Sequence, residues 1–308
     1  MINSENKWCH QDVNEAFAYL YATFTSNSVE GEQLYYAVST DGLHFHVLNK
    51  GDAVFASSIG NQSIRDPYLL RGEKGEFFLV SSDVRSSKDW NGGGTMVTYR
   101  SADLIHWAQG TLYNVNDYPS TQNTHKAWAP EAIYDPKAGQ YLLYWANEAE
   151  GQTQSIWGAY TNFEKLISNP VCLYTSPDGH TLIDPHIYFH DGMYYLYFCD
   201  KVLENGSVSV VQSSCITGPY SGEKQQLNTE KMPSEGPNLY KLIGRDTWIM
   251  LSDGYLNDLV LLRSTTDMFH FTTLQKGKEY DYDFHGRSGS VIQITKKEYE
   301  ALLKAFSV

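Results

Sequence analysis

A short motif recurs five times along this 308-residue chain, and successive copies lie roughly 50 to 65 residues apart. Each copy contains an apolar stretch. Four of the five copies have an acidic residue at or near the start, which is usually followed by a proline. The copies span residues 65–70, 129–134, 183–188, 235–240 and 287–292. A repeat of this length is typical of a propeller blade, a small sheet that buries its faces only against its neighbours in a ring.

Each repeat also follows one internal plan. An opening strand leads into a turn with Gly or Asp, an aromatic-rich second strand, a third strand and a closing strand. Asp191-Gly192, between two apolar runs, is a strong hairpin signal. The first three strands are expected at 68–70, 77–80 and 96–99 in one repeat and at 187–189, 194–198 and 208–211 in another.

Three repeats end in similar tails, in which a serine and an aspartate precede an apolar and an aromatic residue. These tails span residues 39–45, 101–107 and 264–271. Three matching tails are hard to explain by chance, so they support the repeat independently of the opening motif.

The two ends of the chain are expected to complete each other. Residues 17–48 contain strand-like runs at 17–24 and 34–38 but no acidic opening strand, whereas the last motif has no strands after it. A C-terminal strand paired beside 17–24 would close the ring and remove two free sheet edges. The sequence therefore predicts an all-β fold, a five-bladed β-propeller in a single domain over residues 1–308.

A short helix is expected after the last strand. Residues 295–298 form a capping box, in which a threonine and a glutamate each satisfy a backbone N–H at the helix start. Apolar side chains then recur at helical spacing at Tyr299, Leu302, Leu303 and Phe306.

Composition limits the classes of partner. The net charge of -13 disfavours nucleic acid, whose phosphates need basic patches, and also disfavours an anionic membrane surface. The chain start lacks the apolar run of a signal peptide, and no apolar stretch is long enough to span a membrane. The four cysteines have no metal-ligand spacing, so we expect a cytoplasmic location.

Asp66, Asp184 and Glu235 are the candidate catalytic residues. A turn explains any single Asp-Pro pair, as it does for Asp135-Pro136. A turn does not explain why an acidic residue takes the same place in successive repeats. Repeated around a ring, this placement would direct several carboxylates to one axial point, and converging carboxylates are the groups that hydrolyse glycosidic bonds.

Four further residues are expected to contact a substrate, each with a structural alternative. Glu131 shares the position of the three acids, but it could equally bind backbone amides. Trp128 offers an indole face to a sugar ring or fills the core. His186 is either a substrate contact or a satisfied structural group, and Arg287 would balance the ring of negative charge. No His or Cys pattern indicates a catalytic metal.

At these motifs the chain resembles glycoside hydrolase family 43, the five-bladed propeller arabinosidases and xylosidases. The resemblance covers about residues 60 to 300, and its most specific motif is Glu235-Gly236-Pro237-Asn238-Leu239-Tyr240-Lys241. It implies that Asp66 is the general base, Asp184 the modulator of the acid's pKa and Glu235 the general acid. The other matching motifs are Asp66-Pro67, Trp128-Ala129-Pro130-Glu131 and Ile183-Asp184-Pro185.

The chain departs from the family pattern in two places. Many members have Asp where this chain has Glu131. Related arabinan-active enzymes close on Arg-His-Gly-Ser, where this chain has Arg287-Ser288-Gly289-Ser290. The family allows a structural ion on the propeller axis, but without that histidine we do not predict one here. No cofactor is expected.

The expected function is an inverting exo-glycosidase that releases α-L-arabinofuranosyl or β-D-xylosyl units from short plant-derived oligosaccharides. One alternative is a retaining propeller glycosidase of the fructan or sucrose type. That class needs a nucleophilic Asp in an Asn-Asp-Pro-Asn-like opening, which this chain lacks near its start. The other alternative is a non-catalytic carbohydrate-binding propeller, which the three intact acids disfavour.

Overall fold

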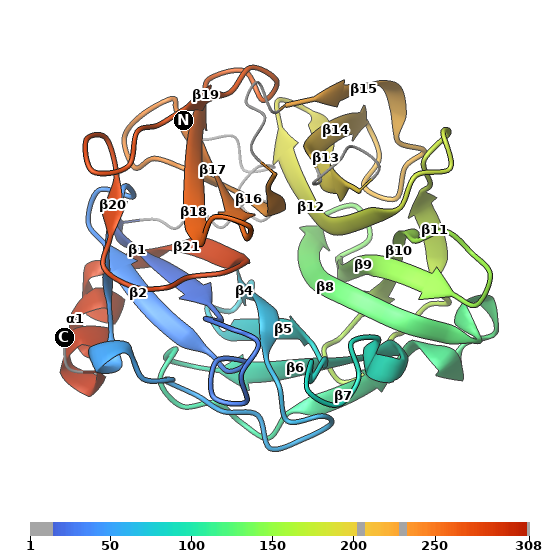
Figure 1. Ribbon diagram of the computed structural model, residues 1–308, viewed down its shortest axis with the longest axis horizontal. Coiled ribbons are helices and arrows are strands. Elements are labelled where there is room, and N and C mark those ends of the chain that lie inside the picture. The colour runs from blue at the N-terminus through green and yellow to red at the C-terminus, as the bar shows by residue number, and fades with distance from the viewer. Residues whose placement is uncertain (1–14, 202–206, 228–232, 307–308) are drawn as a thin grey trace.

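The computed structural model describes residues 15–201, 207–227 and 233–306. Its strands form five sheets arranged around a central axis (Figure 1). This is the all-β, five-bladed propeller that the repeat spacing predicts. We number the blades 1 to 5 in the order in which their innermost strands occur along the chain.

Blades 1 to 4 each contain four antiparallel strands, and each innermost strand carries the repeated motif. Blade 1 comprises β4 (Arg65–Arg71), β5 (Phe77–Ser82), β6 (Thr95–Ser101) and β7 (Thr111–Asn114). Blade 2 comprises β8 (Thr124–Asp135), β9 (Gln140–Ala149), β10 (Ser155–Thr161) and β11 (Val171–Tyr174). Blade 3 comprises β12 (Leu182–His190), β13 (Met193–Asp200), β14 (Ser207–Ser213) and β15 (Ser221–Gln226). Blade 4 comprises β16 (Glu235–Lys241), β17 (Trp248–Gly254), β18 (Leu259–Thr265) and β19 (Thr272–Thr273).

Blade 5 joins the two ends of the chain, as predicted. In the antiparallel pairing of β21 with β1, Val291 lies opposite Tyr21 and Ile294 opposite Ala18. A short parallel strand, β20, extends the outer edge of this blade beyond β3. The strands of blade 5, from the axis outward, are β21 (Gly289–Thr295), β1 (Ala16–Thr23), β2 (Tyr35–Ser39), β3 (His44–Val47) and β20 (Asp281–Tyr282).

Blades 1 to 4 each open with a β-bulge that the proline motif encodes. The residue before the proline has a positive φ, between 44° and 60°, in all four blades. Proline is tolerated because the innermost strand is a sheet edge and the bulge removes a residue from the ladder. The residue before each proline lines a narrow cavity on the propeller axis. The bulged pairs are residues 66–67, 129–130, 184–185 and 236–237.

The bulges correct the predicted alignment of the acidic residues. Asp66 and Asp184 come directly before the proline, but Glu235 comes two residues before it and Glu131 one residue after it. The prediction that the four acids share one position is therefore wrong. Gly236 occupies the bulge position of blade 4. The physical reason is that the proline, and not the acid, marks where the extra residue enters the strand.

A series of hydrogen bonds links consecutive blades near the axis. A polar side chain of one blade, on the innermost strand in three cases and on β9 in the fourth, accepts a backbone N–H from the innermost strand of the next blade. Each contact satisfies a donor that a free sheet edge would leave unpaired. The pairs are Leu69 N with Ser290 Oγ at 2.8 Å, Val291 N with Asn238 Oδ1 at 2.9 Å, Leu239 N with His186 Nε2 at 3.1 Å and Ile187 N with Tyr144 Oη at 3.0 Å.

The hydrophobic core is divided among the blade interfaces. Among the described residues, buried apolar side chains form five clusters, one between each pair of neighbouring blades. Tyrosine suits these interfaces because its ring fills the gap while its hydroxyl reaches the backbone of the next blade. Tyr197 donates to Met268 O at 2.9 Å, and Tyr240 donates to Gly42 O at 2.8 Å. The high tyrosine content of the chain, 23 residues, therefore fits the packing of the blades.

The three similar tails form the same hydrogen-bonded turn, which confirms them as equivalent parts of the repeat. In blade 4, Asp267 accepts the backbone N–H groups of Phe269 and His270 and also pairs with the His270 ring. The equivalent contacts join Asp41 to Leu43 and His44 and join Asp103 to Ile105 and His106.

The predicted helix, α1 (Lys296–Ala305), directly follows β21. Thr295 Oγ1 accepts the Glu298 N–H, and the Glu298 carboxylate accepts the Thr295 N–H, so the capping box is present. Leu302 is buried in the cluster between blades 5 and 1. The described residues also contain short 3-10 turns at Asn49–Gly51, Gly92–Gly94, Val115–Asp117 and Pro119–Thr121.

Candidate active site

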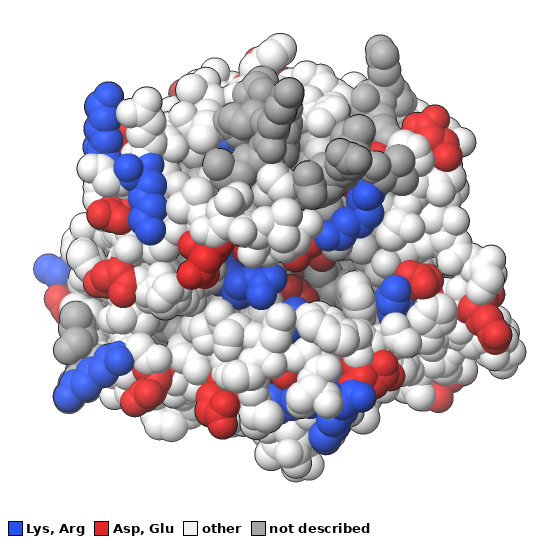
Figure 2. Space-filling model, viewed as in Figure 1, with Lys and Arg blue, Asp and Glu red and all other residues white. Residues whose placement is uncertain are grey.

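The three catalytic candidates meet where the innermost strands begin. Asp66 and Asp184 line the axial cavity, which has a volume of about 20 Å³, and Gly236, next to Glu235, lines it too. A cavity of this size holds about one water molecule. A sugar would therefore lie outside it, in the hollow at the centre of the ring, where acidic and basic side chains gather (Figure 2).

Asp66 occupies the bulge at the start of β4. Ser82 donates its hydroxyl to Asp66 Oδ2 at 3.0 Å, and the same hydroxyl accepts the Ala129 N–H at 2.7 Å. Burial raises the pKa of Asp66, while the Arg65 guanidinium and the Ser82 hydrogen bond act to lower it. The first hydrogen bond orients the carboxyl group, and the second joins blade 1 to blade 2.

Asp184 occupies the matching bulge of blade 3. Its Oδ2 accepts the Gly236 N–H at 3.0 Å, so the carboxyl group is tied to the residue next to Glu235. Burial, together with the charges of Glu235 and Asp66, raises the pKa of Asp184 well above its usual value. Negative charge on either Glu235 or Asp66 therefore opposes ionisation of Asp184.

Glu235 faces two cations. Lys201, which follows β13, places its Nζ 2.6 Å from Glu235 Oε2. Arg287 places a terminal guanidinium nitrogen 3.8 Å from Glu235 Oε1. Charges of both signs thus surround this carboxylate.

Asp253 is a fourth acidic residue at the site, buried on β17 directly opposite Glu235 in the ladder. Its Oδ2 accepts the Arg287 Nε–H at 2.6 Å and the Ser288 N–H at 3.2 Å. Burial raises the pKa of Asp253 to about 6, although Arg287 acts to lower it. Asp253 thereby fixes the guanidinium of Arg287 beside Glu235.

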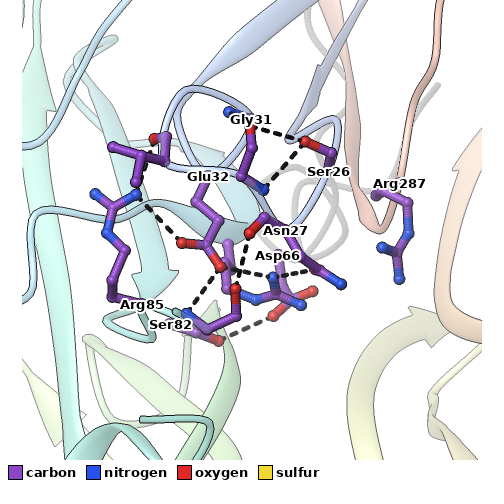
Figure 3. A network of polar contacts seen from close by, with 12 residues as sticks. Ser26, Asn27, Gly31, Glu32, Asp66, Ser82, Arg85 and Arg287 are labelled. Atoms are coloured by element: carbon purple, nitrogen blue, oxygen red, sulfur yellow. Dashed lines mark hydrogen bonds and ion pairs between the residues drawn. The ribbon is translucent and has the colours of Figure 1, made fainter. Parts of the chain in front are cut away.

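A buried ion-pair network lies behind Asp66 (Figure 3). Glu32, in the segment between β1 and β2, is fully buried and pairs with Arg65 at 3.1 Å and with Arg85 at 3.2 Å. Arg65 also donates to Asn27 Oδ1 at 2.7 Å. The network fastens a segment of blade 5 to blade 1 and holds Arg65 in place next to Asp66.

Arg65 is stacked between two aromatic rings. Its guanidinium carbon lies 4.6 Å from the ring centroid of Phe24 and 5.1 Å from that of Trp90. Trp90 lies between β5 and β6 and is 49% exposed. An exposed indole that contacts Arg65, the residue next to Asp66, is suited to stacking on the apolar face of a sugar.

Trp128, the predicted sugar platform, lies near the start of β8 and is partly exposed. Its Nε1–H donates to Asn91 O at 3.1 Å, and Lys126 Nζ lies 5.0 Å from the ring centroid. These contacts fix the indole at the start of blade 2. Contact between Trp128 and a sugar stays a prediction.

Glu131 and His186 are both buried near the axis. His186 Nε2 accepts the Leu239 N–H, so its Nδ1 carries the proton and donates to Glu131 Oε2 at 2.8 Å. Tyr144 donates to the same oxygen at 2.7 Å. These bonds belong to the contacts between blades, which favours a structural role. Contact of either residue with substrate stays a prediction.

Gly236→Ala is expected to be more damaging than Gly51→Ala. Both glycines have a positive φ, 60° and 83°, so each variant incurs about 1–2 kcal/mol of left-handed strain. A Cβ at Gly236 would also lie 2.5 Å from Ser288 Oγ, whereas one at Gly51 has no neighbour within 4 Å. Overpacking should add about 1–3 kcal/mol to the loss of unfolding free energy. Equal losses in urea unfolding would contradict this account.

Comparison with known proteins identifies the family. A family model described as a probable glycosyl hydrolase domain, related to glycoside hydrolase family 43, matches residues 14–300. The chain belongs to this family. An α-L-arabinofuranosidase of Bifidobacterium longum subsp. longum is 24% identical to the family-43-related chain in an alignment that covers 77% of the chain. The match covers 27% of that relative, so the chain spans about a quarter of its length.

Solved structures share the fold of the family-43-related chain. A xylan β-1,4-xylosidase from Bacillus halodurans aligns with a TM-score of 0.58 and 14% identity over 92% of this chain and 56% of its own. A Bacillus subtilis arabinanase aligns with a TM-score of 0.56 and 17% identity over 84% of this chain and 96% of its own. A family-43 β-1,3-galactosidase gives a TM-score of 0.65 and 12% identity over 86% and 58% of the two chains. At these identities the likeness establishes the fold alone.

Three residues at or beside the site of this family-43-related chain were not predicted from its sequence. Trp90 had a usable signal, because a tryptophan in a Gly-rich segment between two strands is poorly placed for a core. Asp253 and Lys201 had none. Asp253 reaches the site because it pairs opposite Glu235 in the sheet, and its own sequence context has no motif. Lys201 follows a strand of another blade that has no motif either.

The described part of the chain contains neither a metal-binding cluster nor a helix suited to span a membrane. Within it, no three His, Cys, Asp or Glu side chains are grouped in a way that could hold a metal ion. No helix in the same ranges combines the length and apolar character that crossing a bilayer requires.

Proposed function

We propose that this protein is an inverting exo-glycoside hydrolase that removes α-L-arabinofuranosyl or β-D-xylosyl units from oligosaccharides. The observation that carries the proposal is the meeting of Asp66, Asp184 and Glu235, from three different blades, beside one hollow. Inversion needs an ionised carboxylate and a protonated acid on opposite sides of the scissile bond, with room for water between them. We also propose that the protein is cytoplasmic, as the cysteine pattern leads us to expect.

Asp66 acts as the general base in this mechanism. Its ionised carboxylate accepts a proton from the water that attacks the anomeric carbon. Arg65 and the Ser82 hydroxyl favour the ionised form, while burial raises the pKa of Asp66. A base whose pKa is raised toward the working pH accepts a proton more readily.

Glu235 acts as the general acid and protonates the glycosidic oxygen as the bond breaks. When Asp184 is ionised, it favours the protonated form of Glu235, because a nearby negative charge opposes ionisation. The Gly236 N–H keeps Asp184 next to the acid. This is a positioning and electrostatic role, and Asp184 itself transfers no proton in the mechanism.

Arg287 and the two tryptophans are the proposed sugar contacts. Asp253 holds the Arg287 guanidinium by Nε, which leaves the terminal nitrogens directed at the Glu235 side of the hollow. Trp90 and Trp128 offer indole faces from blades 1 and 2. Glu32 pins the segment between β1 and β2 against blade 1. For exo action we propose that this segment closes one side of the hollow, so that the site admits the end of a chain rather than its middle.

The pentose preference rests on similarity. The relative from Bifidobacterium is named an α-L-arabinofuranosidase, and solved structures of the same fold include a xylosidase and an arabinanase. Another structure of the same fold is a β-1,3-galactosidase. A galactoside therefore belongs in the experiment that tests the proposal.

The test is an assay with nitrophenyl α-L-arabinofuranoside, β-D-xyloside and β-D-galactoside. We expect hydrolysis of at least one pentoside, with the first-formed sugar in the inverted anomeric configuration by proton NMR. Asp66→Asn, prepared in parallel, controls for contaminating activity. A retained configuration would support the fructan-type alternative. Sugar binding without hydrolysis of any glycoside would support the carbohydrate-binding alternative.

A further inference from the structure

Lys201 makes a direct ion pair with the proposed general acid. Its Nζ lies 2.6 Å from Glu235 Oε2, within charge-assisted hydrogen-bond distance. The two side chains are only 31% and 17% exposed, so solvent weakens this pair less than it weakens a surface pair. The lysine ammonium also lies 5.0 Å from the ring centroid of Tyr255, on the blade that carries Glu235.

The backbone of Lys201 is held firmly enough to keep this pair in place. Lys201 directly follows β13, and its backbone N–H donates to Thr181 O at 3.0 Å. The preceding residue, Asp200, is fully buried and pairs with the His180 ring at 3.1 Å. The lysine therefore reaches Glu235 from a fixed point on blade 3.

Glu235 experiences charges from every element packed against it. Negative charges oppose its ionisation, and positive charges favour it. The titratable and charged groups around it are Asp66 of β4, Asp184 of β12, Cys199 of β13, Lys201 after β13, Asp253 and Tyr255 of the β17 region, and Arg287 before β21.

We propose that Lys201 is a positioning residue that sets the upper pH limit of catalysis by pairing with the ionised form of Glu235. The inference rests on the proposed function, in which Glu235 must carry a proton to act as the acid. An ammonium group in contact with the carboxylate competes with that proton. Lys201 thus acts against Asp184, whose negative charge favours the protonated acid.

The other cation near Glu235 is less suited to this role. Arg287 lies 3.8 Å from Glu235 and is already paired through its Nε with Asp253 at 2.6 Å. The Lys201 ammonium is more than 1 Å closer to the carboxylate than the Arg287 guanidinium is. Removal of Lys201 should therefore have the larger effect on the protonation of Glu235.

The kinetic test compares pH profiles of kcat/KM on the best aryl glycoside. In Lys201→Met the alkaline limb should move to higher pH by about one unit, since an opposite charge at this distance shifts a carboxyl group by about 1–3 units. Lys201→Gln should shift the limb in the same direction, and Lys201→Arg, which keeps the charge, should stay near wild type. Asp184→Asn should move the limb to lower pH.

Lys241→Met is the matched control. Lys241 stands at the opposite end of the strand that begins with Glu235, is 30% exposed like Lys201, and pairs with Asp246 at 3.0 Å. Its loss removes an ion-paired lysine of similar exposure without touching Glu235, so the alkaline limb should not move. An unmoved limb in both Lys201→Met and Lys201→Gln would overturn the proposal, and so would an equal shift in Lys241→Met.

A second readout is independent of activity. Proton–nitrogen NMR of lysine ammonium groups should show a Lys201 signal that is absent from Lys201→Met and slowed in hydrogen exchange by the ion pair. In Glu235→Gln this protection should be lost. Unchanged exchange in Glu235→Gln would show that the pair does not form in solution and would overturn the proposal. A protected signal in a wild-type protein without glycosidase activity would instead disprove the proposed function, and the pH role with it.

Discussion

Glu235→Ala is expected to lower kcat/KM about 10²–10⁴-fold on a pentosyl disaccharide and far less on the matching nitrophenyl glycoside. A sugar hydroxyl is a poor leaving group that needs protonation as the bond breaks. A nitrophenolate leaves with little protonation, so it does not depend strongly on the acid. The measurement is kcat/KM of wild type and variant on both substrates at the pH optimum.

Asp66→Asn should behave differently in the same assay. Asp66 activates the attacking water, a step that both substrates share, so the loss should be about 10²–10⁴-fold on each of them. Asp258→Asn is the control, because Asp258 is a 63% exposed carboxylate in the loop after β17 that pairs with His285. It should leave kcat/KM near wild type.

Two results would contradict these assignments. Equal losses for Glu235→Ala on both substrates would remove Glu235 from the acid role. A loss for Asp66→Asn that depends on the leaving group would mean that Asp66 protonates the leaving oxygen, and the two roles would have to be exchanged. Circular dichroism of each variant separates either result from unfolding.

Glu32→Ala is expected to lower the free energy of unfolding by about 3–5 kcal/mol. Glu32 is fully buried between Arg65 and Arg85 and also accepts the Ser86 N–H at 3.0 Å. Its removal leaves the two guanidinium groups without the carboxylate that both of them contact. Urea unfolding measures the change, with the slope of unfolding free energy against urea concentration expected to be the same in both proteins.

The same variant should lose catalytic efficiency even where it remains folded. Arg65 would lose the partner that holds it beside Asp66, so its effect on the base would weaken. Glu300→Gln is the control, because Glu300 pairs at 3.8 Å with Lys296 and the two side chains are 64% and 68% exposed. A surface pair of this kind contributes about 0–1 kcal/mol. A similar destabilisation in both variants would mean that the buried Glu32 network contributes no more to the free energy of unfolding than a surface ion pair does.

The propeller could be predicted because its signals are local and repeated. Each proline motif marks a bulge, each Asp-containing tail forms its own turn, and the capping box at Thr295 starts the helix within one turn. The pairing of β21 with β1 was predictable for a global reason. A ring with an unpaired strand at each end of the chain has one arrangement that leaves no free edge.

The site could be predicted only in part. The motifs identified Asp66, Asp184 and Glu235, and the structure places all three beside the axis. The predicted alignment of the acids at one shared position was wrong, because each bulge adds a residue to its strand. Acids that stand at different positions relative to the proline can therefore face the same part of the axis. Glu131 lies past the proline of its bulge; it also lines the axial cavity, and its carboxylate pairs with His186.

The sequence by itself determined the number of blades, the closure of the ring and the three acids, because each of these depends on a pattern within a repeat. Tertiary structure alone decided what surrounds those acids. Lys201 comes from blade 3 and pairs with Glu235 of blade 4, while Glu32 comes from blade 5 and supports Arg65 of blade 1. Such partners lie more than 30 residues apart in the chain. Their contact depends on how neighbouring sheets twist and pack, which no periodicity within a single repeat records.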